Sequence, residues 1–192
     1  MGRTREFDRD EALIGAMRVF WRKGYGDTNI ADLVEASGVA RYGWYTTFGG
    51  KDEIFVAALE HYRAYLNRAY LDKLRAPDAD LATIEAHFRL NLGVAARGSL
   101  KGCFACASAL DRGRDDKNVA RVVAAVLADV RAAFRNAIEN AARAGQVRDL
   151  PVDTLVDFSV NAMRHLSTLV RAGAPREEVE AYIKSTLALL AP

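Results

Sequence analysis

Apolar residues recur three or four positions apart along most of the chain, which is the spacing of one face of an α-helix. No segment shows the strict alternation of apolar and polar residues that indicates a half-buried strand. Glycine and proline interrupt the helical pattern, most clearly at Gly24–Gly26, Ala76–Asp78 and Gly173–Pro175. The sequence therefore predicts an all-α protein of about nine helices.

The interruptions divide the chain into segments of helical length. The expected helices are Phe7–Lys23, a helix around Ile30–Val34, Ala40–Thr47, Lys51–Leu74, Leu81–Ala96, Cys103–Leu110, Val119–Ala144, one that Pro151 opens, and a last one that carries Val179 to Leu190. Lys51–Leu74 is expected to be one continuous helix. Cys103–Leu110 is almost wholly apolar and is expected to be buried all round. We expect two domains, residues 1–50 and residues 51–192.

The stretch Thr28–Lys51 has the pattern of a helix-turn-helix. Thr28 or Asn29 can cap the first helix, because either side-chain oxygen can accept from a free backbone N–H. Gly38 can adopt the positive φ that a tight turn between two helices needs. In the second helix Trp44 and Phe48 lie four residues apart and form an inward face.

The opposite face of this second helix carries side chains that suit the major groove of DNA. Arg41 can bind a guanine edge with two hydrogen bonds, and tyrosine or threonine hydroxyls can contact phosphates or bases. Gly43 leaves room for close approach, and Lys51 lies at a helix N-terminus, which favours a phosphate. The predicted DNA contacts are Thr28, Asn29, Ala40, Arg41, Tyr42, Gly43, Tyr45, Thr47 and Lys51.

This part of the chain resembles the DNA-binding signature of the TetR family of bacterial transcriptional regulators. The matching residues keep the order and spacing of the signature and are Gly24, Tyr25, Thr28, Ile30, Leu33, Val34, Gly38, Val39, Gly43, Trp44, Tyr45, Phe48 and Lys51. The resemblance covers about the first third of the chain. The sequence departs from the signature at Ala40, often a capping serine, at Trp44, usually aliphatic, and at Gly49–Gly50, usually a polar pair.

The resemblance implies a two-fold dimer formed through the last two helices. Two recognition helices would then lie roughly 34–36 Å apart, and the operator would be close to palindromic. It also implies that the middle helices enclose a pocket for a small-molecule effector, whose binding moves the linking helix and separates the two DNA-binding heads. The candidate lining residues are Phe55, Tyr62, His87, Phe88, Asn91, Cys103, Phe104, Cys106, Phe134 and Met163.

Most of these candidates are also what an ordinary helical core contains, and we expect more than half of them to be core. His87 and Asn91, four residues apart, are the polar candidates: they either satisfy a neighbour's backbone or contact a ligand. Cys103 and Cys106 form a C-x-x-C pair. The pair could be a thiol or redox switch, because a helix N-terminus lowers a thiol pKa, or it could be inert filler.

Composition limits the remaining possibilities. The chain has 192 residues with 27 basic against 25 acidic side chains, so DNA affinity has to come from a local patch, to which Arg3 and Arg5 could add. The N-terminus has no secretory signal, no apolar run has the roughly 20 residues of a membrane span, and two cysteines give no disulfide framework. We therefore expect a soluble cytoplasmic protein without a membrane partner.

Signatures of enzymes are missing from the sequence. His61, His87 and His165 each lack a glutamate three residues earlier, which a carboxylate-bridged metal bundle needs. No phosphate-binding loop and no nucleophile elbow occurs, and the segment around the cysteines offers no histidine for zinc. We expect no metal, no cofactor and no catalysis. The sequence favours a dimeric, effector-released DNA-binding repressor. The alternatives are a thiol-responsive regulator, a helical small-molecule-binding protein without DNA binding, and a protein-binding helical adaptor.

Overall fold

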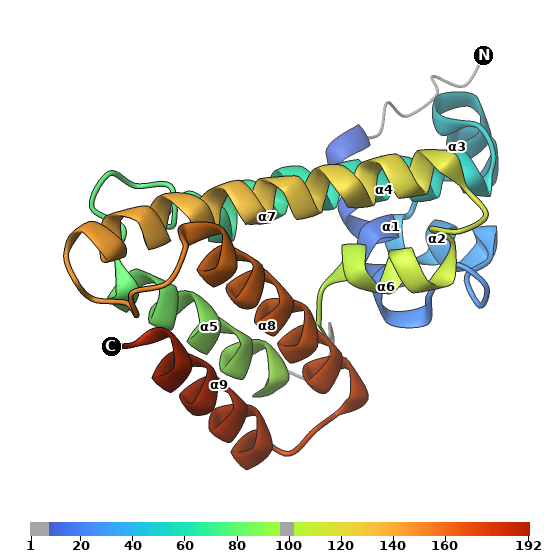
Figure 1. Ribbon diagram of the computed structural model, residues 1–192. Coiled ribbons are helices and arrows are strands. Elements are labelled where there is room, and N and C mark those ends of the chain that lie inside the picture. Colours follow the sequence, from blue (N-terminus) through green and yellow to red (C-terminus); the bar gives the residue numbers. More distant parts are fainter. Residues whose placement is uncertain (1–7, 97–101) are drawn as a thin grey trace.

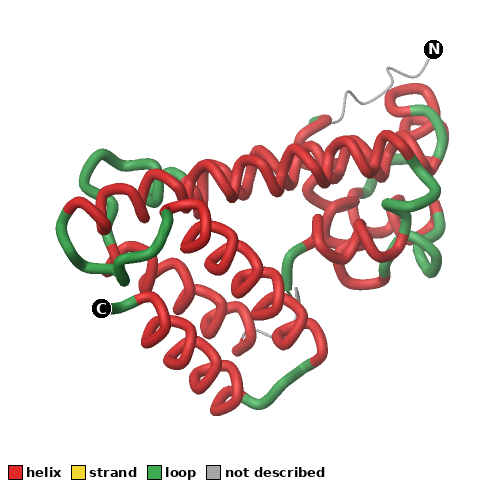
Figure 2. Tube along the Cα trace, in the orientation of Figure 1, coloured by secondary structure: helices red, strands yellow, loops and turns green. Residues whose placement is uncertain are grey.

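The computed structural model describes residues 8–96 and 102–192, and these residues form nine α-helices, one π-helical segment and no strand (Figure 2). The elements are α1 (Arg9–Lys23), α2 (Ile30–Ser37), α3 (Arg41–Phe48), α4 (Lys51–Leu66), the π-helical segment Asn67–Leu71, α5 (Leu81–Ala96), α6 (Phe104–Asp111), α7 (Lys117–Arg143), α8 (Val152–Ala172) and α9 (Arg176–Leu190). The predicted all-α fold is confirmed. Arg3 and Arg5 lie outside the described residues.

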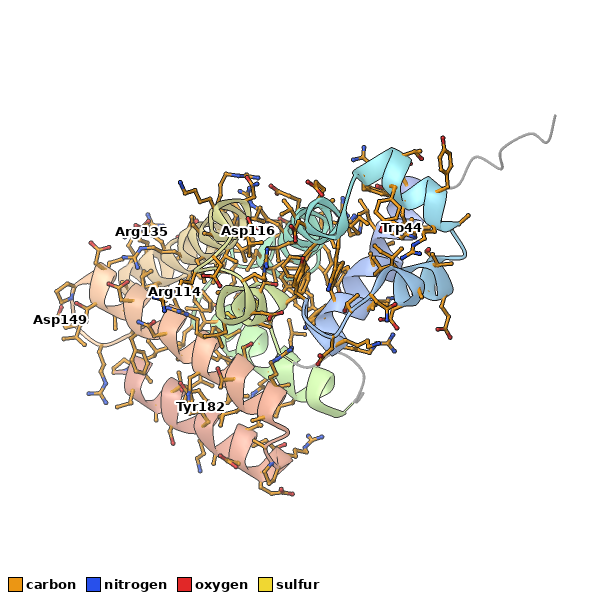
Figure 3. All side chains as sticks on the ribbon, turned by 90° about the vertical axis from the view of Figure 1, so that its right-hand side faces the viewer. Trp44, Arg114, Asp116, Arg135, Asp149 and Tyr182 are labelled. Carbon is orange, nitrogen blue, oxygen red and sulfur yellow. The ribbon has the colours of Figure 1, made fainter. Side chains whose placement is uncertain are left out.

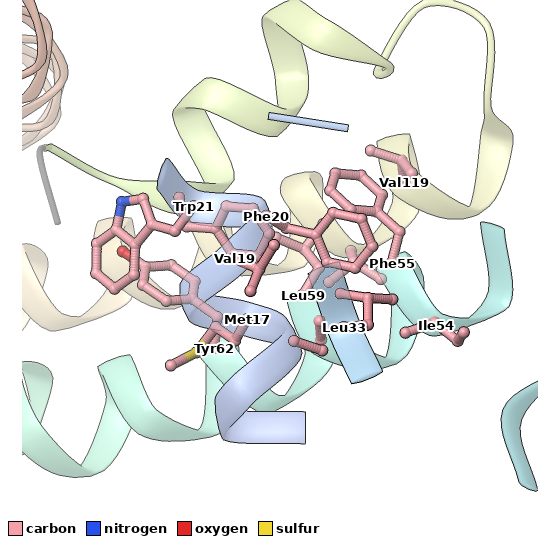
Figure 4. Packing of buried hydrophobic residues seen from close by; sticks show 14 of the residues in the cluster. Met17, Val19, Phe20, Trp21, Leu33, Ile54, Phe55, Leu59, Tyr62 and Val119 are labelled. Atoms are coloured by element: carbon pink, nitrogen blue, oxygen red, sulfur yellow. The ribbon is translucent and has the colours of Figure 1, made fainter. Parts of the chain in front are cut away.

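Two long helices connect the ends of the molecule. Helices α4 and α7 lie alongside each other, with α1, α2 and α3 at one end and α5, α8 and α9 at the other (Figure 1). Helix α6 packs against α4 and α7 and lies beside α1 (Figure 1). Two clusters of buried side chains follow this division. The first joins α1 to α4 with α6 and the start of α7 (Figure 4), and the second joins α5, α8 and α9 with the remainder of α7.

Helix α4 is shorter than expected. The sequence predicts one helix over Lys51–Leu74, but regular α-helix ends at Leu66 and a π-helical segment follows. The Asn67 side chain donates to the Arg63 carbonyl at 2.8 Å and to Asp129 Oδ2 of α7 at 2.9 Å. A side chain bonded to the helix's own carbonyls competes with the regular ladder, and single π-helical turns inside α-helices are frequently found at functional sites.

Helix α6 is not buried all round, contrary to the expectation for Cys103–Leu110. Phe104, Ala105 and Ser108 are buried on one face, whereas Leu110 is 90% exposed. The helix lies on the surface of α4 and α7 and is therefore amphipathic in its environment, although its sequence is almost wholly apolar. The boundary between two domains at residue 50 stays a prediction, since the first core cluster includes residues from both sides of it.

Candidate DNA-binding surface and small-molecule cavity

The first helix of the helix-turn-helix is capped as the sequence predicts. The Asn29 side chain accepts from the Asp32 N–H at 3.0 Å, and the Asp32 carboxylate accepts from the Asn29 N–H at 2.8 Å. This reciprocal pair is a capping box. Gly38 ends α2 with a φ of +69°, which only glycine adopts at no steric cost, and the chain then turns into α3.

Helix α3 has two faces of opposite character. Trp44 is fully buried, and its ring centroid lies 5.1 Å from that of Phe48. Figure 3 shows Trp44 between α3 and the other helices of this end. On the opposite face Tyr42 is 77% exposed and Tyr45 is 45% exposed. We call the exposed side chains of Arg41, Tyr42, Tyr45 and Thr47 the recognition face.

Two of the predicted DNA contacts are turned inward. Thr28 is buried, and its hydroxyl donates to the Gly24 carbonyl at 2.6 Å, so this side chain holds the turn before α2 instead of facing outward. Lys51 Nζ lies 4.1 Å from the centroid of the Tyr25 ring, a cation–π contact. Asn29 and Ala40 are exposed and lie at the N-caps of α2 and α3. Gly43 lies within α3 and is half-buried.

Tyr25 joins three elements that are far apart in the sequence. Its ring lies between Lys51 of α4 and Arg112, whose Cζ is 4.3 Å from the ring centroid. Its hydroxyl donates to Asp52, and its backbone N–H donates to Asp111 Oδ2 at 2.6 Å. Burial, followed by the hydrogen bond to Asp52, raises the pKa of Tyr25 to about 12. The end of α6 is thus tied to the loop that precedes α2.

A small cavity of about 110 Å³ lies between the two core clusters. Seven elements contribute to it: α1, α4, the π-helical segment, α5, the start of α6, α7 and α8. Its wall is mainly aromatic and aliphatic and consists of Trp21, Tyr62, Tyr65, Leu66, Tyr70, Leu71, His87, Leu90, Gly102, Cys103, Cys106, Val126, Leu127, Val130, Val160, Met163, Arg164 and Ser167.

Five of the predicted lining residues are in this wall: Tyr62, His87, Cys103, Cys106 and Met163. Four are not, because their rings pack into the cores. The centroids of Phe55 and Phe104 lie 5.7 Å apart, and those of Phe88 and Phe134 lie 5.9 Å apart. The side chain of Asn91 lies outside the described residues.

Sequence reasoning missed much of the wall. Trp21 is not among the predicted lining residues, yet it lies in α1 and lines the cavity beside Tyr62, with ring centroids 5.1 Å apart (Figure 4). Tyr65 and Tyr70 stack edge to face, with centroids 5.7 Å apart, across the change from α-helix to π-helix. At this change Asn67 bonds Asp129 of α7, a distant residue that no local pattern around Tyr70 indicates.

Two polar atoms of the wall are buried without a hydrogen-bond partner in the described part of the chain. These are the indole Nε1 of Trp21 and the Nδ1 of His87. Burial lowers the pKa of His87 to about 4, against which a hydrogen bond to the Tyr70 backbone acts. The imidazole is therefore neutral near pH 7, and the lone pair of Nδ1 is a free acceptor because the other nitrogen serves Tyr70.

Cys103 is the most strongly bonded group of the wall. Its sulfur accepts from the Tyr62 hydroxyl at 3.2 Å, and its backbone N–H donates to Ser167 Oγ at 2.5 Å. The Cys106 thiol also donates to it, which lowers the pKa of Cys103 and raises that of Cys106. Gly102 precedes it with a φ of +70°, and a Cβ there would lie 2.4 Å from the Ser167 carbonyl oxygen.

Metal sites and membrane-spanning helices are both absent from residues 8–96 and 102–192. No group of three or more histidine, cysteine or acidic side chains in these ranges is arranged to hold a metal ion. Among the same residues, no helix combines the length and the apolar character that crossing a membrane requires.

Comparisons with known proteins agree with this geometry. The sequence pattern described as "Bacterial regulatory proteins, tetR family" matches residues 13–58, which run from α1 into α4. The uncharacterized HTH-type transcriptional regulator YezE of Bacillus subtilis is 25% identical over 99% of this chain and 100% of its own length. The HTH-type transcriptional repressor ComR of Escherichia coli is 48% identical over 61 residues, which are 32% of this chain and 29% of ComR.

The likeness extends to three dimensions. A cysteine-substituted form of the TetR family transcriptional regulator CifR, solved with 26-bp double-stranded operator DNA, has a TM-score of 0.84 and 28% sequence identity, covering 98% of this chain and 100% of that one. The helix-turn-helix, the all-helical architecture of the described residues and these similarities lead to one conclusion. The chain belongs to the TetR family of bacterial transcriptional regulators.

Proposed function

We propose that the protein is a dimeric transcriptional repressor that binds a palindromic operator through α3 and is released by a small molecule in the cavity. The observation that carries the proposal is the contrast between the faces of α3. A buried Trp44 fixes the helix, while the side chains of Arg41, Tyr42, Tyr45 and Thr47 on the same helix are exposed. Polar and aromatic side chains on a short exposed helix suit contacts in a major groove.

The roles within the DNA-binding surface follow from side-chain chemistry. Arg41 reads a base edge, and the hydroxyls of Tyr42, Tyr45 and Thr47 contact phosphates or bases. Asn29 and Ala40 lie at the helix starts and Gly43 allows close approach. Lys51 leaves the Tyr25 ring to bind a phosphate, for which a cation–π contact at a partly exposed site is a weak competitor. The operator complex of CifR and the name of ComR support this reading.

A ligand in the cavity would act on the DNA-binding helices directly. Trp21 lies in α1 and lines the cavity, and its carbonyl accepts from Arg171 of α8 at 3.2 Å. A second connection runs along α6, whose first turn begins at the cavity wall and whose last residue, Asp111, accepts from the Tyr25 N–H. A ligand in the cavity can therefore displace α1 through Trp21 and the loop before α2 through α6.

The dimer is part of the same proposal and uses α8 and α9. These two helices pack against each other at the end of the molecule away from α3 (Figure 1), where a second copy can complete a four-helix bundle. Two copies would place their recognition faces roughly 34–36 Å apart, one turn of DNA. A protein that acts on the bacterial chromosome works in the cytoplasm, and no catalytic step is included.

The proposal is tested by selecting bound sequences from a random duplex library with the purified protein. We expect a palindromic consensus whose half-sites lie about one helical turn apart. The protein should elute as a dimer in light scattering. A library without enrichment at low salt, or a monomer that binds single half-sites, would contradict the proposal.

Two substitutions separate base contacts from phosphate contacts on the selected operator. Arg41→Ala should weaken binding by about 1–3 kcal/mol and relax the preference at one base pair per half-site. Lys51→Ala should weaken binding to all sequences alike and reduce the salt slope by about one. Arg143→Ala, exposed in the last turn of α7 and outside both α3 and the proposed dimer helices, is the matched control and should change neither quantity. Unchanged affinity and base preference in Arg41→Ala would show that α3 is not the recognition helix.

A further inference from the structure

The cavity wall combines three features that an ordinary core does not need. Among the described residues, it has an indole N–H without an acceptor, an imidazole nitrogen without a donor, and a cysteine held by hydrogen bonds. A buried polar group without a partner lowers stability, so a core evolved only for stability would pair or remove it. The three features point to a ligand that reacts as well as binds.

Cys103 is the nucleophile among these groups. Its sulfur lies at the N-cap of α6, where the backbone N–H groups favour an anion, and it receives hydrogen bonds from Tyr62 and Cys106. Both donors stabilise a thiolate on Cys103. Neither stabilises a thiolate on Cys106. The hydrogen bonds between the two sulfurs lower the pKa of Cys103 and raise the pKa of Cys106. The pair is therefore asymmetric, with one thiolate and one thiol donor.

The position of this sulfur is rigidly set. Ser167 Oγ accepts from the Cys103 N–H, and Gly102 packs so closely on α8 that no side chain fits there. A nucleophile held in one position gains from orientation as well as from ionisation. Inert filler would not require a glycine with positive φ against the neighbouring helix.

The remaining wall defines the electrophile. Most of it is aromatic or aliphatic, which selects an apolar molecule about the size of one ring. The Trp21 N–H is a donor and requires an acceptor on the ligand, such as a carbonyl oxygen. His87 Nδ1 accepts from a hydroxyl or N–H where the ligand carries one.

We propose that the cavity captures apolar α,β-unsaturated carbonyl compounds covalently, with Cys103 Sγ as the nucleophile and the Trp21 indole N–H bonded to the carbonyl oxygen. The thiolate adds to the β-carbon and forms the C–S bond, and the electron pair of the C=C bond moves to give an enolate. The enolate takes one proton at its α-carbon from solvent. The sum is addition of S–H across C=C, without an oxidant and without a leaving group.

This chemistry deepens the proposed function, since it names the class of effector. The adduct would occupy the space beside Trp21 of α1 and would end the hydrogen bond from Tyr62 to the thiolate. Both changes occur where the cavity contacts α1 and the start of α6, the two elements that connect it to the DNA-binding helices. Formation of the adduct should therefore release operator DNA.

The probe is 2-cyclohexen-1-one, an apolar enone about the size of one ring. Intact-mass measurement on the full chain should show addition of one whole enone, and peptide mapping should place it on Cys103. Cys103→Ser should abolish the adduct, while the matched control Cys106→Ser should keep it at a lower rate. An adduct on Cys106, equal labelling of both cysteines, or no adduct would overturn the proposal.

A second probe isolates the role of Trp21. Trp21→Phe should slow the reaction with the enone at least about tenfold, because a donor to a developing oxyanion is lost. It should leave the reaction with methyl methanethiosulfonate, which has no carbonyl group, within about twofold. Equal slowing of both reactions would assign Trp21 to packing only. Thermal unfolding curves of each variant confirm that it is folded before it is used.

The pH profile tests the hydrogen bonds to the thiolate. The rate in the wild-type chain should be nearly flat above neutral pH, because the hydrogen bond from Cys106, together with that from Tyr62, lowers the pKa of Cys103 to about 6. Tyr62→Phe should move the rise of the rate to higher pH. If hydrogen peroxide instead joins Cys103 to Cys106 and the enone does not react, the pair is an oxidation switch and the proposal fails.

The two proposals fail in different ways. If the unmodified protein selects no DNA while mass spectrometry shows the Cys103 adduct, the function as a repressor fails and the capture chemistry stands. If the protein binds its operator and the adduct forms without changing that affinity, the site captures enones but the regulatory assignment is wrong.

Discussion

The recognition face and the cavity are both places where polar groups lack protein partners, but they lack them for opposite reasons. On α3 the groups are exposed to solvent, so water satisfies them until DNA replaces it. In the cavity the unpaired nitrogens of Trp21 and His87 are buried, so no solvent compensates them. The exposed groups of the recognition face therefore lower the stability of the fold very little. The buried nitrogens lower it until a ligand forms hydrogen bonds with them.

The two sites also differ in how they are built. The recognition face comes from one eight-residue helix, and a single buried side chain, Trp44, fixes it. The cavity takes side chains from seven elements between Trp21 and Ser167. Damage to the first should be local and abrupt, whereas damage to the second should spread into the packing of several helices. The predictions below examine this difference.

The largest effect is expected from Trp44→Ala. It removes a fully buried indole and should lower the free energy of unfolding by about 3–5 kcal/mol, measured by denaturant titration followed by circular dichroism. Tyr42→Ala on the exposed face is the comparison and should change stability by less than about 0.5 kcal/mol. Both should lose operator binding. A stable Trp44→Ala variant would show that other contacts suffice to fix α3.

Acid should act on the cavity through His87. The folded pKa is about 4 and the ordinary value is 6.5, so below pH 6.5 the unfolded chain binds a proton that the folded chain does not. Stability that is present above this value is therefore lost as the pH falls toward 4, by about 3 kcal/mol. In His87→Phe, the free energy of unfolding should no longer show this loss between pH 6.5 and 4. The control His165→Gln should show the same loss as the wild type. Parallel curves for wild type and His87→Phe would contradict the prediction.

A smaller effect is expected from Gly102→Ala. The new Cβ would meet the Ser167 carbonyl oxygen at 2.4 Å on a backbone with a φ of +70°, which should cost about 1–3 kcal/mol of stability and displace Cys103. Gly26→Ala is the matched control, because nothing lies within 4 Å of its added Cβ. Thermal unfolding of the two variants measures the difference. Equal melting temperatures would mean that the start of α6 can move away from α8 freely.

The difference between the two sites also explains what the sequence could predict. Asn29 as a cap, Gly38 with positive φ and Trp44 facing inward all follow from residues that are neighbours in the chain, and the structure has all three. Helical spacing also predicts which side chains turn away from solvent. It cannot tell Phe134, fully buried in the core, from Met163, which lines the cavity, because both satisfy the same spacing.

The features that escaped prediction depend on hydrogen-bond partners that the helical pattern does not name. The π-helical segment begins at Asn67, whose side chain donates to Asp129, 62 residues away, and the segment includes Tyr70 of the cavity wall. Threonine is a residue type typical of an exposed helix cap, but the Thr28 hydroxyl donates to the Gly24 carbonyl in the turn before α2. In both cases the hydrogen-bond partner, and not the residue type, decides what the side chain does.

The chain has two tryptophans, and one lies in each of the two sites. Trp44 anchors the recognition helix and Trp21 lines the cavity, so the protein carries an intrinsic fluorophore at either end of its regulatory path. The single-tryptophan chains Trp44→Phe and Trp21→Phe would report the two ends separately. Emission from Trp21 alone would follow a compound entering the cavity, and emission from Trp44 alone would follow the arrival of DNA. The delay between the two signals after rapid mixing would measure the time that a structural change takes to travel from the cavity to α3.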